Sequence, residues 1–126
     1  MIRKAALFLL CAILISNIAM AQTGTKMLRH VVLFGWKANA DSAAINNIVT
    51  AFKALPGKIS LIKQFEWGTN NSPENLNQGL TYCFLLSFSS EKDRDAYLVH
   101  PDHKAFAALL QPWLDKVTVV DYWSQQ

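Results

Sequence analysis

Two predicted strands, at residues 27–37 and 80–88, carry mainly apolar side chains on both of their faces. Successive side chains of a strand point to opposite faces of its sheet, so both faces of this sheet need cover. The alternating positions of the first strand form two sets: His30, Val32, Phe34 and Trp36 on one face, and Arg29, Val31 and Leu33 on the other. This double requirement limits the folds that the chain can adopt.

A first helix is predicted after this strand from apolar residues at helical spacing. These residues are Ile45, Ile48, Val49, Phe52 and Leu55. Asn39 or Asp41 provides the N-terminal cap, and Pro56-Gly57 is expected to end the helix, because proline cannot continue the hydrogen-bond ladder. Further strands are predicted at residues 59–68 and 116–123, and a loop at residues 69–79.

A broken helix is predicted between the third and fourth strands. Ser90 caps its first part, which is interrupted at His100-Pro101. Its second part has Pro101 in its first turn, and its predicted inner side consists of Phe106, Leu109, Leu110 and Trp113. The order strand, helix, strand, strand, broken helix, strand indicates an α+β fold. It is the ferredoxin-like βαββαβ pattern, with a four-stranded antiparallel sheet.

Helices in this topology cover one face of the sheet and leave the other face open. Residues 22–126 contain no further element that would cover the second face. We therefore expect a second copy of the chain, with the two sheets packed face to face as a dimeric α/β barrel. A monomer with an open ligand groove is the alternative.

Residues 1–21 have the pattern of a secretory signal peptide. Arg3 and Lys4 precede an apolar run that is too short to span a bilayer, and residues 19–21 form a small-x-small cleavage site. We expect residues 22–26 to be a short flexible lead and residues 27–124 to be the domain. The processed protein is expected to be exported, periplasmic or secreted, and free of the membrane. An uncleaved anchor or a mis-assigned start codon is the alternative.

The composition excludes several classes of protein. With 52% hydrophobic residues and a net charge of +3, the chain can bury a core and is not expected to be disordered. No basic patch offsets phosphate charge, so no nucleic-acid partner is expected. Two cysteines are too few for a disulfide framework or a four-cysteine zinc site. Cys83 has apolar neighbours and is expected to be buried and inert.

Five segments carry a family resemblance. They are HVVLF at residues 30–34, LPGKI at 55–59, GTNNSPE at 68–74, YLVHPDHKAF at 97–106 and VTVVDY at 117–122. On these segments the chain resembles the stress-responsive A/B barrel domain family, usually called Dabb, over roughly residues 27–123. The resemblance implies a dimeric α/β barrel, in agreement with the expectation from the apolar faces. Many members of the family are described only as stress-associated or uncharacterised.

A plant branch of this family acts as a polyketide cyclase, which performs an intramolecular aldol condensation without a cofactor. Such a reaction needs a base beside a carbonyl and a donor for the resulting oxyanion, roles that suit histidine and tyrosine. By resemblance to that branch, His103 is the candidate base and Tyr97 the candidate hydroxyl donor. The candidate ligand-binding residues are His30, Phe34, Tyr82, Tyr97, His100 and His103. Tyr82 stands where the cyclase branch has a further histidine.

Structural roles for the same residues stay open. His100 can cap the helix that follows it, and His103 can hydrogen-bond Asp102 or Asp121 instead of acting on a substrate. His100 and His103 are three residues apart, but Pro101 disturbs the helix between them, so no metal site is expected. No cofactor is expected either.

Three functions remain open. The first is an exported, stress-associated homodimer that binds a small apolar or aromatic molecule in its barrel. The second is a cofactor-free, cyclase-like enzyme, although export would separate it from the thioester substrates of intracellular polyketide synthesis. The third is a purely structural oligomer.

Overall fold

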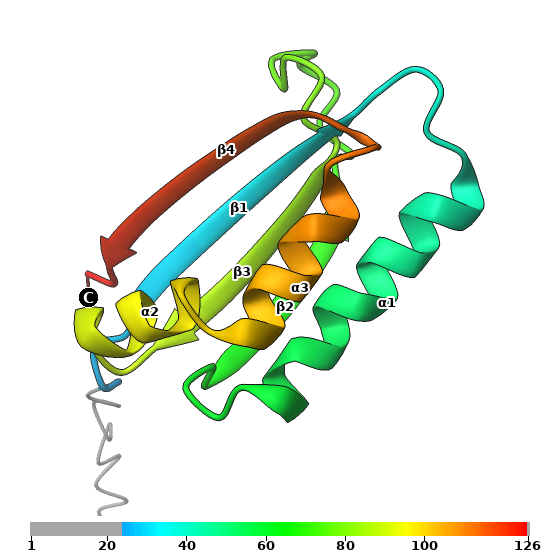
Figure 1. Ribbon diagram of the computed structural model, residues 1–126. Coiled ribbons are helices and arrows are strands. Elements are labelled where there is room, and N and C mark those ends of the chain that lie inside the picture. The colour runs from blue at the N-terminus through cyan, green and yellow to red at the C-terminus, as the bar shows by residue number, and fades with distance from the viewer. Residues whose placement is uncertain (1–23, 126) are drawn as a thin grey trace, which may run out of the picture.

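The computed structural model describes residues 24–125, so the expected signal peptide lies outside the described residues. The elements shown in Figure 1 are β1 (Leu28–Trp36), α1 (Ser42–Lys58), β2 (Gln64–Thr69), β3 (Tyr82–Phe88), α2 (Glu91–Leu98), α3 (Pro101–Leu110) and β4 (Leu114–Trp123). Within residues 24–125, no helix combines the length and apolar character needed to cross a membrane.

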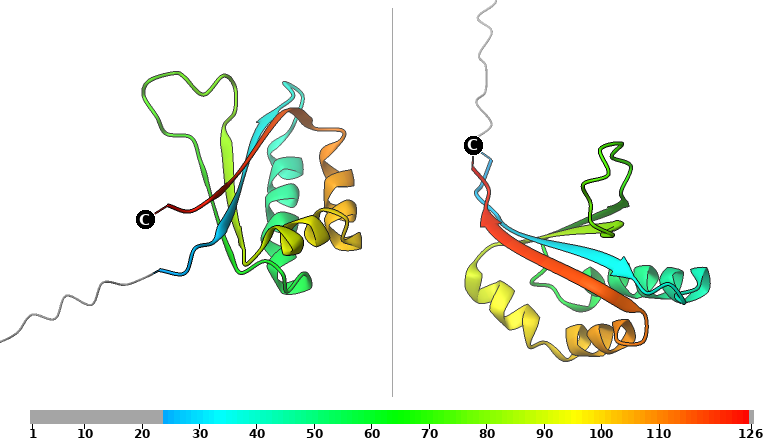
Figure 2. Two further views of the ribbon diagram at one scale, coloured as in Figure 1. Left: turned by 90° about the vertical axis from the view of Figure 1, so that its left-hand side faces the viewer. Right: turned by 90° about the horizontal axis from the view of Figure 1, so that it is seen from above.

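The four strands form one antiparallel sheet in the order β2-β3-β1-β4. All three helices lie on the same face of this sheet, as Figures 1 and 2 show. The prediction of a ferredoxin-like βαββαβ fold is confirmed, with the broken helix divided into α2 and α3. Because β1 is central, each of its residues has neighbours on two strands. His30, for example, pairs with Leu86 of β3 and Asp121 of β4.

The helices begin where the capping residues predict. Oδ1 of Asp41 accepts a hydrogen bond from the backbone N–H of Ala44 at 2.7 Å. Oγ of Ser90 accepts from the N–H of Asp93 at 3.0 Å. His100 caps α3, with its Nδ1 accepting from the N–H of Asp102 at 3.1 Å. These bonds satisfy backbone donors that have no partner inside the helix.

Two predicted boundaries differ from the structure, the end of the first helix only slightly and the start of the second strand by five residues. Helix α1 continues through Pro56 to Lys58, because the backbone N–H of Ile59 still donates to the carbonyl of Leu55 at 2.8 Å. Strand β2 begins at Gln64 rather than at residue 59. The apolar residues Ile59 and Ile62 are buried in the core without strand pairing. The alternation of Ile59 and Leu61 with Phe65 and Trp67, which predicts the longer strand, is therefore part of a strand only from Gln64 onward.

The core lies between the helices and the sheet and is rich in aromatic rings. The ring of Phe52, on α1, has its centroid 4.5 Å from that of Phe84, 4.3 Å from that of Phe106 and 5.3 Å from that of Phe65. Side chains of α1, α3, β2 and β3 thus fill this layer. Leu109, predicted on the inner side of α3, is instead exposed.

The face of the sheet without helices carries a mixed surface. Val31, Leu33 and Leu85 lie half-buried at its centre, and Cys83 on the same face is exposed. The expectation that Cys83 is buried is therefore wrong, because strand alternation turns its side chain away from the core. Partial desolvation, and then the nearby Glu66 carboxylate, raise the pKa of this thiol. The thiol is therefore mainly protonated at neutral pH.

The segment between β2 and β3 stands out on this helix-free side (Figure 2). The backbone N–H of Thr81 donates to the carbonyl of Phe34 at 2.9 Å, which fixes the segment to the end of β1. Gly35 lies beneath it, and a Cβ at this position would come within 2.6 Å of the Gly79 carbonyl oxygen. This close approach requires glycine at position 35.

Candidate functional site

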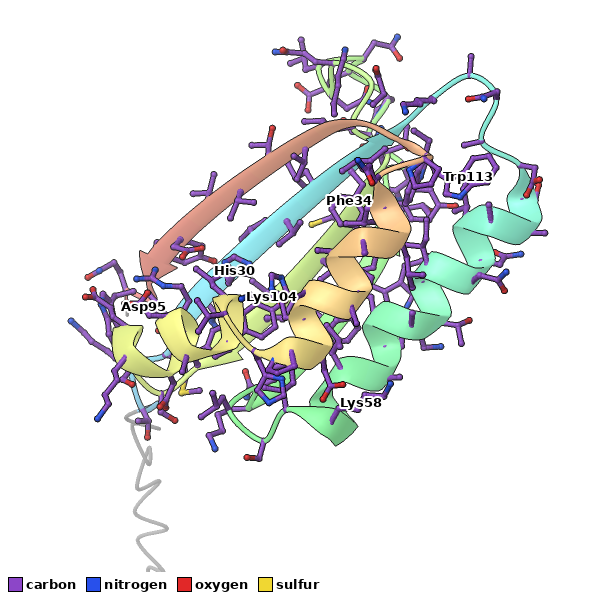
Figure 3. All side chains as sticks on the ribbon, viewed as in Figure 1. His30, Phe34, Lys58, Asp95, Lys104 and Trp113 are labelled. Carbon is purple, nitrogen blue, oxygen red and sulfur yellow. The ribbon has the colours of Figure 1, made fainter. Side chains whose placement is uncertain are left out.

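Three side chains from three elements meet between the sheet and the α2–α3 corner. We call His30, Tyr97 and His103 the acid–base cluster. The ring of Tyr97 lies 4.4 Å from the ring of His103, at an interplanar angle of 47°, and 5.8 Å from the ring of His30, at 73°. In Figure 3, His30 lies between β1 and this corner.

The break between α2 and α3 brings Tyr97 and His103 together. Residues six apart on one continuous α-helix would project about 120° apart around the axis. Val99 and His100 leave the helix, and Pro101 starts the next one in a new direction. The two rings can then meet although Tyr97 ends one helix and His103 begins another. The sequence predicts this break, but the contact that it produces needs the structure.

The protonation state of His103 follows from one hydrogen bond and its burial. Nδ1 of His103 lies 3.0 Å from the Leu98 carbonyl oxygen, at the end of α2. A carbonyl can only accept, so Nδ1 carries the proton and, in the neutral ring, Nε2 keeps a free lone pair. Burial lowers the pKa of His103 below its ordinary value, outweighing the opposite effect of the Leu98 bond. The ring is therefore a neutral base at pH 7.

Tyr97 presents a hydroxyl that stays protonated. Its side chain is 1% exposed, and burial raises its pKa well above the ordinary value of 10. Among residues 24–125, this hydroxyl makes no hydrogen bond to the protein. A neutral hydroxyl without an internal partner is available to donate to a ligand oxygen.

His30 is held by a carboxylate and not by the other members of the cluster. Its side chain is 5% exposed, and its Nδ1 lies 2.6 Å from Oδ1 of Asp121. Oδ2 of the same carboxylate accepts from Nη1 of Arg94, on α2, at 2.5 Å. Asp121 reaches His30 because the β1–β4 register places them opposite each other. The carboxylate of Asp121, on β4, thus links His30 of β1 to Arg94 of α2.

The structural alternatives for the histidines have different outcomes. His100 caps α3, as one of those alternatives predicts, and its use of Nδ1 for this bond separates it from the cluster. His103 bonds the Leu98 carbonyl rather than Asp102 or Asp121. Within residues 24–125, no group of three or more metal-ligating side chains is close enough to hold a metal ion.

Phe34 and Tyr82, predicted as ligand contacts, lie at the other end of the sheet. Phe34 is four residues beyond His30 on β1, which corresponds to about 13 Å along the strand. It contacts Trp36 at 5.5 Å and Phe84 at 5.2 Å between ring centroids. Tyr82 stacks on Trp67. The structure does not bring these two residues to the cluster, and their role in binding stays a prediction.

Sequence reasoning missed Arg94 as a site residue and assigned Asp121 to the wrong histidine. Arg94 precedes Tyr97 by three residues, so the two share a helix face, which is a local signal that the sequence does contain. The pairing of Asp121 with His30 depends on strand register. That register cannot be derived from alternation alone.

A separate groove of about 760 Å³ lies on the helix-free face. Its floor is formed by Val31, Leu33 and Leu85, and the segment between β2 and β3, including Leu76 and Leu80, forms one side. The sheet separates this groove from the acid–base cluster, because residues 31 and 33 point opposite to residue 30. The protein thus has two candidate sites on opposite faces.

The sheet order, the helices on one face and the cluster beneath α2 define a ferredoxin-like α+β domain with polar groups between helix and sheet. Residues 28–124 match the model of the family described as "Stress responsive A/B Barrel Domain". The chain belongs to this family, Dabb, and the resemblance stated from the sequence is confirmed.

Relatives and solved structures extend this assignment. The stress-response A/B barrel domain-containing protein HS1 of Arabidopsis thaliana is 36% identical over 95 residues, or 75% of this chain and 87% of the relative. Olivetolic acid cyclase of Cannabis sativa is 22% identical over 95 residues, or 75% of this chain and 94% of the relative. A dimeric ferredoxin-like protein of unknown function from Thermobifida fusca has a TM-score of 0.67 at 26% identity, over 77% of this chain and 90% of that chain.

Proposed function

We propose that this Dabb protein is a cofactor-free acid–base catalyst for a small carbonyl compound, with His103 as the base and Tyr97 as the hydroxyl donor. The observation that carries the proposal is the bond from Nδ1–H of His103 to the Leu98 carbonyl. Because Nδ1 carries the proton, the free lone pair of the neutral ring is on Nε2, and burial lowers the pKa of this ring. A base of this kind needs no cofactor to act near neutral pH.

The chemistry is a proton transfer from carbon. Nε2 of His103 removes a proton from the carbon next to the carbonyl, and the C–H electron pair becomes the C=C bond of an enolate. The negative charge moves to the carbonyl oxygen, where the hydroxyl of Tyr97 donates a hydrogen bond. The enolate carbon then attacks a second carbonyl of the same molecule or takes back a proton. The likeness to a protein named as a cyclase supports this class of reaction.

The burial of the three rings sets the direction of approach. His103 is only half-buried, whereas Tyr97 and His30 lie behind it, toward the sheet. A substrate would therefore enter beside His103 at the α2–α3 corner and place its oxygen toward Tyr97. The interior beyond Tyr97 is occupied by Phe88, whose ring centroid is 5.1 Å away. This packing favours a compact carbonyl compound.

A second function, binding of a small apolar or aromatic molecule, is favoured by the groove on the helix-free face. The groove has an apolar floor and a volume suited to such a ligand. In a homodimer this face would lie inside the barrel. The partly apolar helix-free surface and the dimeric relative from Thermobifida fusca support a homodimer. Native mass spectrometry of the purified protein measures its subunit number and any co-purifying molecule, and an empty monomer would contradict this reading.

Export through residues 1–21 is part of the proposal and rests on the sequence pattern alone. Intact mass measurement of the protein from the periplasm or the medium tests it. The expected mature chain begins at Gln22, whereas an intracellular protein that still contains residues 1–21 would contradict export. A purely structural oligomer would retain the fold but show no turnover at the cluster.

The catalytic proposal is tested by deuterium uptake into the methyl group of acetophenone in heavy water, followed by proton NMR. The wild type is expected to accelerate uptake over buffer, and His103→Ala is expected to lower the rate by about 100-fold or more. Lys104→Ala, an exposed neighbour on α3, is the matched control and should leave the rate unchanged. A wild-type rate no higher than that of His103→Ala contradicts the proposal.

A further inference from the structure

We infer that Arg94 is a positioning residue of the acid–base cluster and acts through Asp121 on both His30 and the helix that carries Tyr97. The inference rests on the proposed function for the catalytic role of the cluster. The contacts between Arg94, Asp121 and His30 are independent of that role. Each oxygen of the Asp121 carboxylate has its own partner. Oδ1 lies 2.6 Å from Nδ1 of His30, and Oδ2 lies 2.5 Å from Nη1 of Arg94.

The first effect of Arg94 is on the orientation of His30. A carboxylate accepts hydrogen bonds, so the bond to Asp121 places the proton of neutral His30 on Nδ1 and leaves Nε2 unprotonated. Arg94 holds Oδ2 and thereby prevents the carboxylate from rotating away from the imidazole. Without Arg94, nothing among residues 24–125 would bond Oδ2 in its present position. His30 would then lose its fixed tautomer.

The second effect is on α2. Tyr97 is the buried side chain of this eight-residue helix. Apart from Tyr97, α2 therefore has little apolar packing that would hold it against the sheet. Two polar contacts join it to β4, the Arg94–Asp121 pair and a bond from Nε1 of Trp123 to Oε1 of Glu91 at 3.2 Å. Arg94 lies three residues before Tyr97, close to the ring that the helix must present. The Arg94–Asp121 pair therefore helps to set the position of the Tyr97 ring.

The pair is partly shielded from solvent, because the side chains of Arg94 and Asp121 are 19% and 22% exposed. Exposed ion pairs contribute little by themselves, so the importance of this one lies in the second bond of its carboxylate, to the nearly inaccessible His30. The loss of Arg94 should consequently disturb Asp121 and the groups that depend on it.

Asp95 provides a matched control within the same ion-pair network. Nε of Arg94 donates to Oδ1 of Asp95 at 2.8 Å, but the Asp95 side chain is 65% exposed. Asp95 has no bond to His30 or Asp121 among the described residues. Asp95→Asn thus weakens an ion pair of Arg94 without touching the link to the cluster.

The experiment measures the ring nitrogens of His30 by NMR on protein labelled with nitrogen-15 histidine. The chemical shifts distinguish a protonated from an unprotonated ring nitrogen, and no substrate is needed. At a pH where the His30 ring is neutral, wild type and Asp95→Asn are expected to show protonated Nδ1 and unprotonated Nε2. Arg94→Met is expected to shift both signals toward each other, as the two tautomers exchange, and Arg94→Lys is expected to restore part of the difference. His30 signals that are the same in Arg94→Met and wild type overturn the inference.

Deuterium uptake into acetophenone gives the functional arm. Arg94→Met is expected to lower kcat by between about 10-fold and 100-fold with little change in KM, because positioning and not binding is lost. If Arg94→Met does not fold, Arg94→Gln is measured in the same two assays. An unchanged kcat in a folded Arg94 variant overturns the inference. Absence of turnover in the wild type rejects the proposed function instead, and the tautomer measurement then decides the role of Arg94 by itself.

Discussion

Val119 and Val120 are neighbours on β4, have exposures of 50% and 52%, and point to opposite faces of the sheet. Val119 pairs with Val32 on the side of the helices, whereas Val120 pairs with Val31 on the helix-free side. The two positions have the same residue type, the same strand and nearly the same exposure. They differ only in the face that they occupy, so the same substitution at each position tests one face of the sheet at a time.

Val120→Lys is expected to convert the proposed homodimer into monomers. Packing two helix-free faces together would bury the new ammonium group, and a buried unpaired charge is strongly unfavourable. Val119→Lys places the same group on the other face and should leave the dimer intact. Sedimentation velocity of both variants measures the result. A Val120→Lys protein that sediments as a dimer would show that this face is not the interface.

Tyr97→Phe is expected to separate catalysis from stability. The substitution removes a hydroxyl that has no internal partner among the described residues. The free energy of unfolding should therefore change by less than about 1 kcal/mol. Deuterium uptake into acetophenone should fall by about 100-fold, because the enolate oxygen loses its donor. Urea unfolding and the uptake assay on one preparation provide both values, and unchanged uptake would remove Tyr97 from the mechanism.

The lowered pKa of His103 predicts a loss of stability in mild acid. As the pH falls below the ordinary value of 6.5, the unfolded ring binds a proton while the folded ring stays neutral. Proton binding then favours the unfolded state. The stability that the neutral His103 contributes above pH 6.5 is therefore lost as the pH falls through the pKa of the folded protein. Urea unfolding of wild type and His103→Gln at about pH 7.5 and pH 5 measures it. The wild type should lose more stability than the variant, and equal losses would contradict the lowered pKa.

Gly35→Ala is expected to destabilise the protein by about 1–3 kcal/mol, because the added Cβ would overlap the Gly79 carbonyl oxygen and backbone would have to move. Gly68→Ala is the control, since a Cβ at this strand position meets no atom within 4 Å. Thermal unfolding of both variants gives the comparison. Equal melting temperatures would mean that the segment between β2 and β3 moves away from β1 without cost.

The fold could be predicted from the sequence because its determinants are local. Strand alternation gives the faces of β1 and β3, and Asp41, Ser90 and His100 are capping residues whose position marks the start of each helix. The start of β2 could not be predicted, because Ile59 and Leu61 continue the alternation of Phe65 and Trp67, whereas the chain at residues 59–63 forms a turn and Ile59 packs into the core. Residues 64–69 pair with β3 and residues 59–63 do not, and this pairing is not a local property of the sequence.

The acid–base cluster could be predicted only in part. The contact between Tyr97 and His103 follows from a break at Pro101 that the sequence indicates, although the angle between the two helices is set by packing. The link from Arg94 through Asp121 to His30 joins three elements, and it depends on the register of β4 against β1. The error at Cys83 has a different cause, since strand alternation turns its side chain away from the core although its neighbours in sequence are apolar.

The bond between His30 and Asp121 joins the first and last strands of the domain, over 91 residues of sequence. During synthesis on the ribosome, β1 emerges long before β4, so the imidazole has no carboxylate beside it until almost the whole domain has been translated. A chain that ends before β4 thus lacks the carboxylate that holds His30. The acid–base cluster would be complete only in finished molecules.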